Sequence, residues 1–143
     1  MPNSLDAWPI FYNLSAQGNI GEIIKIGAND PKISSLILHF DQFRYLRRAL
    51  GREVEKHMKV LIPLMVAGCA WAREKAKKAV SISVSLDPFL EDEEERYYNL
   101  FFKKEFSAKG FPVFANVEKA IKTLAYLCQW VGKLHNHPAI TVN

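Results

Sequence analysis

The chain has 143 residues, of which 49% are hydrophobic and 24% are charged, and this is the size and composition of one domain with its own core. The formal net charge of +4 is too small to indicate an anionic partner by itself. No run of about 18 apolar residues lacks a charge or a proline, and the first residues do not resemble a signal peptide. We therefore expect a single cytoplasmic domain over residues 1–143, with no membrane partner.

The two cysteines, Cys69 and Cys128, are far apart in the sequence and lie in apolar stretches with helical spacing. Neither belongs to a Cys-x-x-Cys or Cys/His cluster of the kind that binds metal or carries redox chemistry. We interpret both as buried thiols.

The N-terminal part of the chain predicts an irregular segment followed by a helix and a strand. Residues 1–18 contain two prolines and a glycine and form the irregular lead-in. From Asn19 onward, isoleucines at helical spacing predict a short amphipathic helix, which ends before Pro31 because the residue preceding a proline disfavours helix. The short apolar run 35–40 then predicts a buried strand.

Residues 41–78 predict a long helical block. Asp41 is a suitable N-cap, and Pro63 is expected to bend or split the block. Residues 60–66 fit either a helix or a strand, and we favour the helix because charged residues flank them at helical spacing and no turn signal precedes them. A solvated basic face is the ordinary interpretation of the four clustered arginines, with phosphate contact as the alternative: Arg44, Arg47, Arg48 and Arg52.

A second strand and helix follow. Apolar residues alternate with serine over 79–86, which is a strand pattern that ends at Asp87-Pro88. The acidic run 91–95 suits the N-terminus of a helix better than a metal site, because consecutive carboxylates point in different directions around a helix. The predicted buried stripe of this helix is Tyr98, Phe101, Phe102 and Phe106.

The last unit is a strand, a tight turn and a helix. Gly110 ends the preceding helix, and the apolar residues between Gly110 and Ala115 predict a strand buried by helices. Asn116 is a good N-cap, and residues 134–143 form a polar tail. The apolar stripe predicted for this helix is Val117, Ala120, Ile121, Leu124, Leu127, Cys128 and Val131.

Short apolar strands separated by helices predict an α/β fold with a three-layer, flavodoxin-like or Rossmann-like parallel sheet and helices on both faces. Ligands of such sheets bind at the carboxyl ends of the strands. The residues expected at those ends, and therefore the candidate ligand-binding residues, are His39, Asp41, Asp87 and Asn116.

Common catalytic motifs are absent from the sequence: Gly-x-Gly-x-x-Gly, the Walker lysine loop, Gly-x-Ser-x-Gly and His-Glu-x-x-His. We assign no catalytic residue and no metal ligand. His39 is a candidate for ligand contact, although a lone histidine at a strand end is more often structural, and His57 is expected on a helix surface. His135 and His137 lie in the tail, where nothing nearby completes a metal site.

Three segments, in order along the chain, resemble parts of the NDP-forming acyl-CoA synthetases, the relatives of succinyl-CoA synthetase. Asn3-Ser4-Leu5-Asp6 is similar to the family's Asn-Pro-hydrophobic-Asp signature, with Ser4 in place of proline. Asn29-Asp30-Pro31-Lys32-Ile33 resembles its Asp-Pro-x-Val segment before a strand. The most specific match is the Gly-hydrophobic-Pro-hydrophobic strand and its helix, here Gly110-Phe111-Pro112-Val113 followed by 117–124.

The resemblance implies the final flavodoxin-like CoA-ligase domain of those enzymes, without its Gly-Gly-containing first strand, and it adds Asn3 and Asp6 to the candidate ligand-binding residues. The CoA-binding Rossmann domain, the ATP-grasp domain and the segment with the phosphorylated histidine have no counterpart here. The resemblance therefore implies a non-catalytic fragment or small subunit that meets CoA and ADP or ATP only through a parent assembly.

Its implied partners are other synthetase domains or subunits, or a second copy of the chain. The alternative is a stand-alone domain that binds CoA or a nucleotide at the strand ends with His39 or Asp87. We expect no nucleic-acid partner, because aromatic and basic residues fall on opposite faces of the predicted helices.

Overall fold

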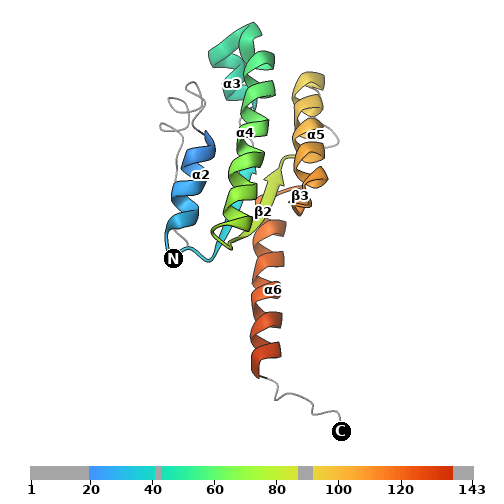
Figure 1. The fold of residues 1–143 in the computed structure, drawn as a ribbon. Helices are drawn as coiled ribbons and strands as arrows, with labels where there is room; N and C mark the ends of the chain where they lie inside the picture. Colours follow the sequence, from blue (N-terminus) through green and yellow to red (C-terminus); the bar gives the residue numbers. More distant parts are fainter. Residues whose placement is uncertain (1–19, 41–42, 87–91, 137–143) are drawn as a thin grey trace.

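The computed structural model describes residues 20–40, 43–86 and 92–136 (Figure 1). The predicted lead-in, residues 1–18, lies outside these ranges. The elements in chain order are α2 (Ile20–Asn29), β1 (Ser35–Phe40), α3 (Phe43–Leu50), the 3-10 turn η1 (Gly51–Glu53), α4 (Val54–Glu74), β2 (Ala79–Val84), α5 (Glu93–Ala108), β3 (Val113–Phe114) and α6 (Val117–Asn136).

The three strands form one parallel sheet in the order β1-β2-β3, which confirms the predicted α/β fold class. Leu38 pairs with Ile82, and these side chains join the main core together with those of α4 and α5. Successive side chains of a strand point to opposite faces, so Ser81 and Ser83 lie on the other face, where α6 contacts all three strands. Both serines are buried, and their small side chains suit a helix that packs closely.

The long helical block is interrupted at Gly51 and not at Pro63. Gly51 has a φ of +54°, a conformation that favours glycine, and the 3-10 turn there separates α3 from α4. Helix α4 then runs without a break from Val54 to Glu74, so the helical interpretation of residues 60–66 is confirmed and the expected split at Pro63 is wrong. Pro63 is exposed, so water can solvate the carbonyl that lacks an intrahelical donor.

Helices α2 and α4 cross at two glycines. A Cβ atom built on Gly68 would lie 3.0 Å from the Cα atom of Gly21 and 3.2 Å from the Cβ atom of Ile24. Such a close approach lets α2 bury Ile20 and Ala28 completely in the core. The crossing holds α2 against α4 beside the sheet (Figure 1).

Helix α6 is longer than the sheet that it covers. Its 20 residues span about 30 Å, whereas the six residues of β1 span about 20 Å. Ala120 is fully buried, but Leu127, two turns further along the same side of the helix, is 51% exposed. Figure 1 shows the C-terminal half of α6 projecting away from the other helices. The helix continues to Asn136, into the segment that the sequence assigned to a polar tail from residue 134.

The buried stripe of α5 follows the sequence prediction except at Phe101, which is half-buried. Tyr98, Phe102 and Phe106 are buried, and Phe102 stacks on Phe40 with ring centroids 4.5 Å apart. Cys69 is buried as predicted, and desolvation raises the pKa of its thiol to about 12. The side chain of Cys128 lies outside the described part of the structure.

Candidate functional site at the carboxyl edge of the sheet

The carboxyl ends of the strands are the predicted ligand edge, and two of the six candidate residues belong to the described part of the chain. These are His39 in β1 and Asn116 between β3 and α6. The other four candidates lie outside the described residues: Asn3, Asp6, Asp41 and Asp87.

His39 belongs to a row that crosses the sheet on the side of α6. It pairs in register with Ser83 of β2, which pairs with Phe114 of β3. The Nδ1 atom of His39 lies 3.2 Å from the Oγ atom of Ser83, within hydrogen-bond distance. His39 is exposed whereas Ser83 is fully buried, so solvent reaches the imidazole and not the hydroxyl. This arrangement suits ligand contact through the ring better than attack by the serine.

Asn116 has a structural role at the same edge. Its side-chain oxygen accepts a hydrogen bond of 2.9 Å from the backbone N–H of Lys119, so it is the N-cap that the sequence predicted. Asn116 follows Phe114 by two residues, and it is exposed. His39 and Asn116 therefore lie at the same edge of the sheet, one in the first strand and the other just after the third.

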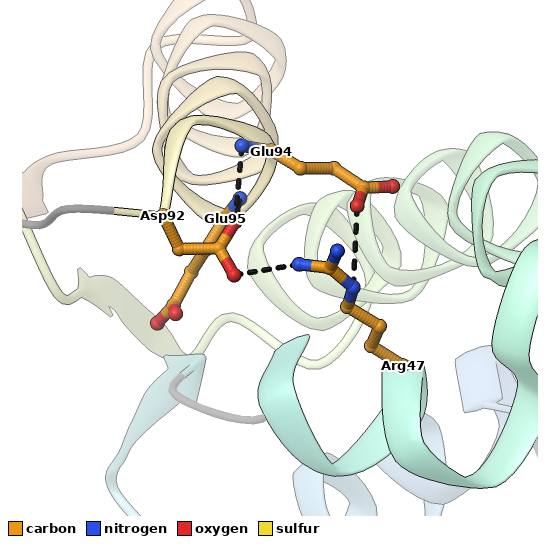
Figure 2. Close-up of polar contacts among 4 residues, drawn as sticks. All are labelled: Arg47, Asp92, Glu94 and Glu95. Carbon is orange, nitrogen blue, oxygen red and sulfur yellow. Dashed lines mark hydrogen bonds and ion pairs between the residues drawn. The ribbon is translucent and has the colours of Figure 1, made fainter.

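The N-terminus of α5 holds a cluster of charged side chains (Figure 2). Asp92 is the N-cap, and its Oδ1 atom accepts hydrogen bonds from the backbone N–H groups of Glu94 (3.1 Å) and Glu95 (3.0 Å). Arg47 of α3 donates from Nη1 to the Oδ2 atom of Asp92 at 2.6 Å, and its Nε atom lies 3.4 Å from Glu94. In Figure 2 the carboxylate of Glu95 points away from Arg47.

This cluster occupies the anion-binding groups of the edge. A helix N-terminus and an arginine are the groups that commonly bind phosphate in α/β folds. Here they already bind the carboxylate of Asp92, which satisfies the first backbone donors of α5. A phosphate that binds at the N-terminus of α5 has to displace Asp92 both from the backbone N–H groups of the helix and from the guanidinium of Arg47.

His57 differs from its predicted surface position. It is half-buried on α4, next to the fully buried Met58, and its Nε2 atom is buried without a hydrogen-bond partner in the described part of the chain. Burial lowers the pKa of His57 from its ordinary value, because the protonated ring loses hydration. The sequence placed His57 on the helix surface, whereas the structure buries part of its ring, including the Nε2 atom.

Sequence reasoning missed the pairing of Arg47 with Asp92 and the contact of Ser83 with His39. The pattern Asp92-x-x-Glu95 was an available signal for the cap, since an acid or amide followed three residues later by Glu marks helix N-termini. No signal in the sequence linked Arg47 to it, because 45 residues separate the partners.

The described residues show neither a metal-binding cluster nor a helix that could span a membrane. Over residues 20–40, 43–86 and 92–136, no three His, Cys, Asp or Glu residues gather as a metal site would require. No helix in those same ranges combines the length and the apolar character needed to cross a bilayer.

The fold and its edge define a small three-layer α/β domain whose parallel sheet exposes His39 on the side of α6, while Asp92 caps the N-terminus of α5. No family model matches the chain, and no curated protein or solved structure shows significant similarity to it.

Proposed function

We propose that this chain is a non-catalytic association domain of an NDP-forming acyl-CoA synthetase assembly, present as a fragment or small subunit that needs partner domains for activity. The parallel α/β sheet agrees with the CoA-ligase domain that the sequence resembles. The occupied N-terminus of α5 supports a role without chemistry of its own, because Asp92 takes the donors that a nucleotide phosphate needs.

The observation that carries the proposal is the apolar side of α6, which we call the α6 face: the exposed Val117, Ile121 and Leu127 and the half-buried Leu124. Ile121 is 53% exposed and Leu127 is 51% exposed. These residues lie on one side of a helix that extends past the sheet (Figure 1). Contiguous apolar side chains on a protruding helix are typical of an interaction surface, because covering them removes apolar area from water.

The test is reconstitution with the missing domains. We expect the full-length chain to co-elute with the CoA-binding and ATP-grasp chains of an NDP-forming synthetase from the same organism. Lysine at both Ile121 and Leu127 should abolish co-elution. Val60→Lys is the matched control, since Val60 is equally exposed, at 56%, but lies on α4. Failure of the unaltered chain to co-elute, or an equal effect of the control, contradicts the proposal.

A second candidate function rests on a different observation, the exposed imidazole of His39 above Ser83 at the ligand edge. In this alternative the isolated chain binds CoA or a nucleotide by itself. Calorimetry with CoA, acyl-CoA, ADP and phosphate separates the two candidates. Binding that falls at least about tenfold in His39→Ala, with Lys122→Ala as the exposed control on α6, favours the stand-alone domain.

A further inference from the structure

Among the residues that the structure describes, strand β1 lies at an edge of the sheet. In the order β1-β2-β3 it has one neighbour, and the described residues contain no hydrogen-bonded partner on its other side. Alternate backbone groups of an edge strand point away from the sheet and present a row of donors and acceptors. Only another extended strand satisfies such a row regularly.

The composition of β1 lacks the features that protect edge strands. Its sequence, Ser-Leu-Ile-Leu-His-Phe, contains no proline, lysine or carboxylate. Residues 35–38 are only half-buried, whereas the less apolar residues 80–84 of β2 are all buried. The more apolar strand is therefore the less buried one, and within the described residues it has a strand neighbour on one side alone.

Helix α2 extends the same apolar surface. The Cβ position of Gly27 lies 4.0 Å from the Cδ2 atom of Leu36, which places this side of α2 over β1. Ile20, Ile24 and Ala28 are buried on the side toward α4. At 100° per residue, Ile26 points away from that side, and it is 72% exposed. We call β1 and the exposed side of α2 with Ile26 the edge surface.

We infer that the edge surface pairs with its own copy, so that two chains join antiparallel along β1 across a two-fold axis. Such pairing makes one continuous sheet and keeps like faces together, because residues directly opposite in an antiparallel pair share a face. Leu36 and Leu38 of the two copies then form one apolar row. The inference is independent of the proposed function, which depends on the α6 face.

The charges near Ile26 favour a second copy. Glu22 and Lys25 form an ion pair of 2.6 Å with each other on the exposed side of α2. The two-fold axis runs the two α2 helices antiparallel, so that Glu22 of one copy approaches Lys25 of the other. A parallel arrangement would place like charges together. Antiparallel pairing thus lets the two copies share backbone hydrogen bonds along β1, contacts between apolar side chains, and opposite charges on α2.

The experiment combines light scattering with hydrogen exchange on the full-length chain. We expect a dimer, with the amides of β1 gaining protection as concentration rises while those of β2 stay unchanged. Ile26→Lys should raise the dimer dissociation constant at least tenfold without unfolding the chain, since Ile26 is exposed. Val60→Lys, an exposed apolar residue on α4, should leave the constant unchanged.

Three results overturn the inference. The first is a monomer at millimolar concentration. The second is a monomer whose β1 amides are already protected at every concentration, which shows that another part of the same chain covers the edge. The third is a dimer that forms through another surface. Either a dissociation constant that does not respond to Ile26→Lys or β1 amides that exchange at the same rate in monomer and dimer would show this.

Discussion

At the scale of single residues, the crossing of α2 and α4 depends on the missing side chain of Gly68. In Gly68→Ala the new methyl group meets the Cα and backbone O atoms of Gly21 at 3.0 Å, and backbone atoms cannot move aside without moving the helix. Alanine favours a helix by about 1 kcal/mol over glycine, but overpacking costs about 1–3 kcal/mol. The two effects together predict a net loss of up to about 2 kcal/mol in the free energy of unfolding, measured by urea denaturation.

The matched control is Gly27→Ala on α2. There the added Cβ atom has ordinary contact, 4.0 Å from the Cδ2 atom of Leu36, so the helix preference of alanine acts alone. Unfolding should require about 0.5–1 kcal/mol more free energy in this variant. Equal stability changes of the same sign in both variants would contradict the close crossing.

The partly buried ring of His57 makes stability depend on pH. Burial lowers the pKa of His57 below the ordinary 6.5 of the unfolded chain, so the unfolded state binds the proton more readily. The contribution to the free energy of unfolding is fully present above about pH 6.5 and is lost as pH falls through the folded-state pKa.

We therefore compare the unaltered chain with His57→Phe at pH 7 and at pH 5. Relative to the variant, the unaltered chain should have a smaller free energy of unfolding at pH 5 than at pH 7. Denaturation series at several pH values measure this difference. A difference that stays constant over that range contradicts the burial of the Nε2 atom of His57 without a hydrogen-bond partner in the described part of the chain.

At the scale of the element, the start of α5 depends more on its cap than on its ion pair. Asp92 accepts two backbone hydrogen bonds, and loss of an N-cap costs about 0.5–2 kcal/mol. The bond between Arg47 and Asp92 joins side chains that are 47% and 33% exposed, and such ion pairs contribute about 0–1 kcal/mol.

Three substitutions separate these contributions. Asp92→Ala should destabilise the chain most, by about 1–2 kcal/mol, because both the cap and the ion pair are lost. Asp92→Asn keeps the capping oxygen, and Arg47→Met keeps the cap intact, so each should cost less than about 1 kcal/mol. Thermal or urea unfolding gives the order, and a larger loss in Arg47→Met than in Asp92→Ala would show that the ion pair dominates.

At the scale of the whole molecule, local stability should vary more along α6 than along the other described helices. Its first turns cover the sheet, where Ala120 is fully buried, but from about Leu127 onward it extends beyond the strands. An isolated helical segment of this length is marginal in water. In the isolated chain we expect backbone amides after Leu127 to exchange much faster than those of α4, as measured by hydrogen exchange, and to become protected when a partner binds the α6 face.

The sequence predicted the elements and their type well, because hydrophobic period and breakers act locally. The stripe of Tyr98, Phe102 and Phe106 on α5 is an example, and so is the cap by Asn116. The alternation of apolar residues with serine likewise identified the strand β2. The candidate site was predicted less well: His39 and Asn116 do lie at the expected edge, but the sequence did not show that Arg47 and Asp92 close its helix N-terminus.

By itself, then, the sequence determined a parallel α/β sheet, since short apolar strands joined by helices have few other ways to bury both faces. The tertiary structure decided what depends on length and on distant partners. It set the point at which α6 extends beyond the strands, and it placed the break in the helical block at Gly51 and not at Pro63. It also decided the partial burial of His57. These features depend on which surfaces meet in space, and periodicity along the chain carries no record of that.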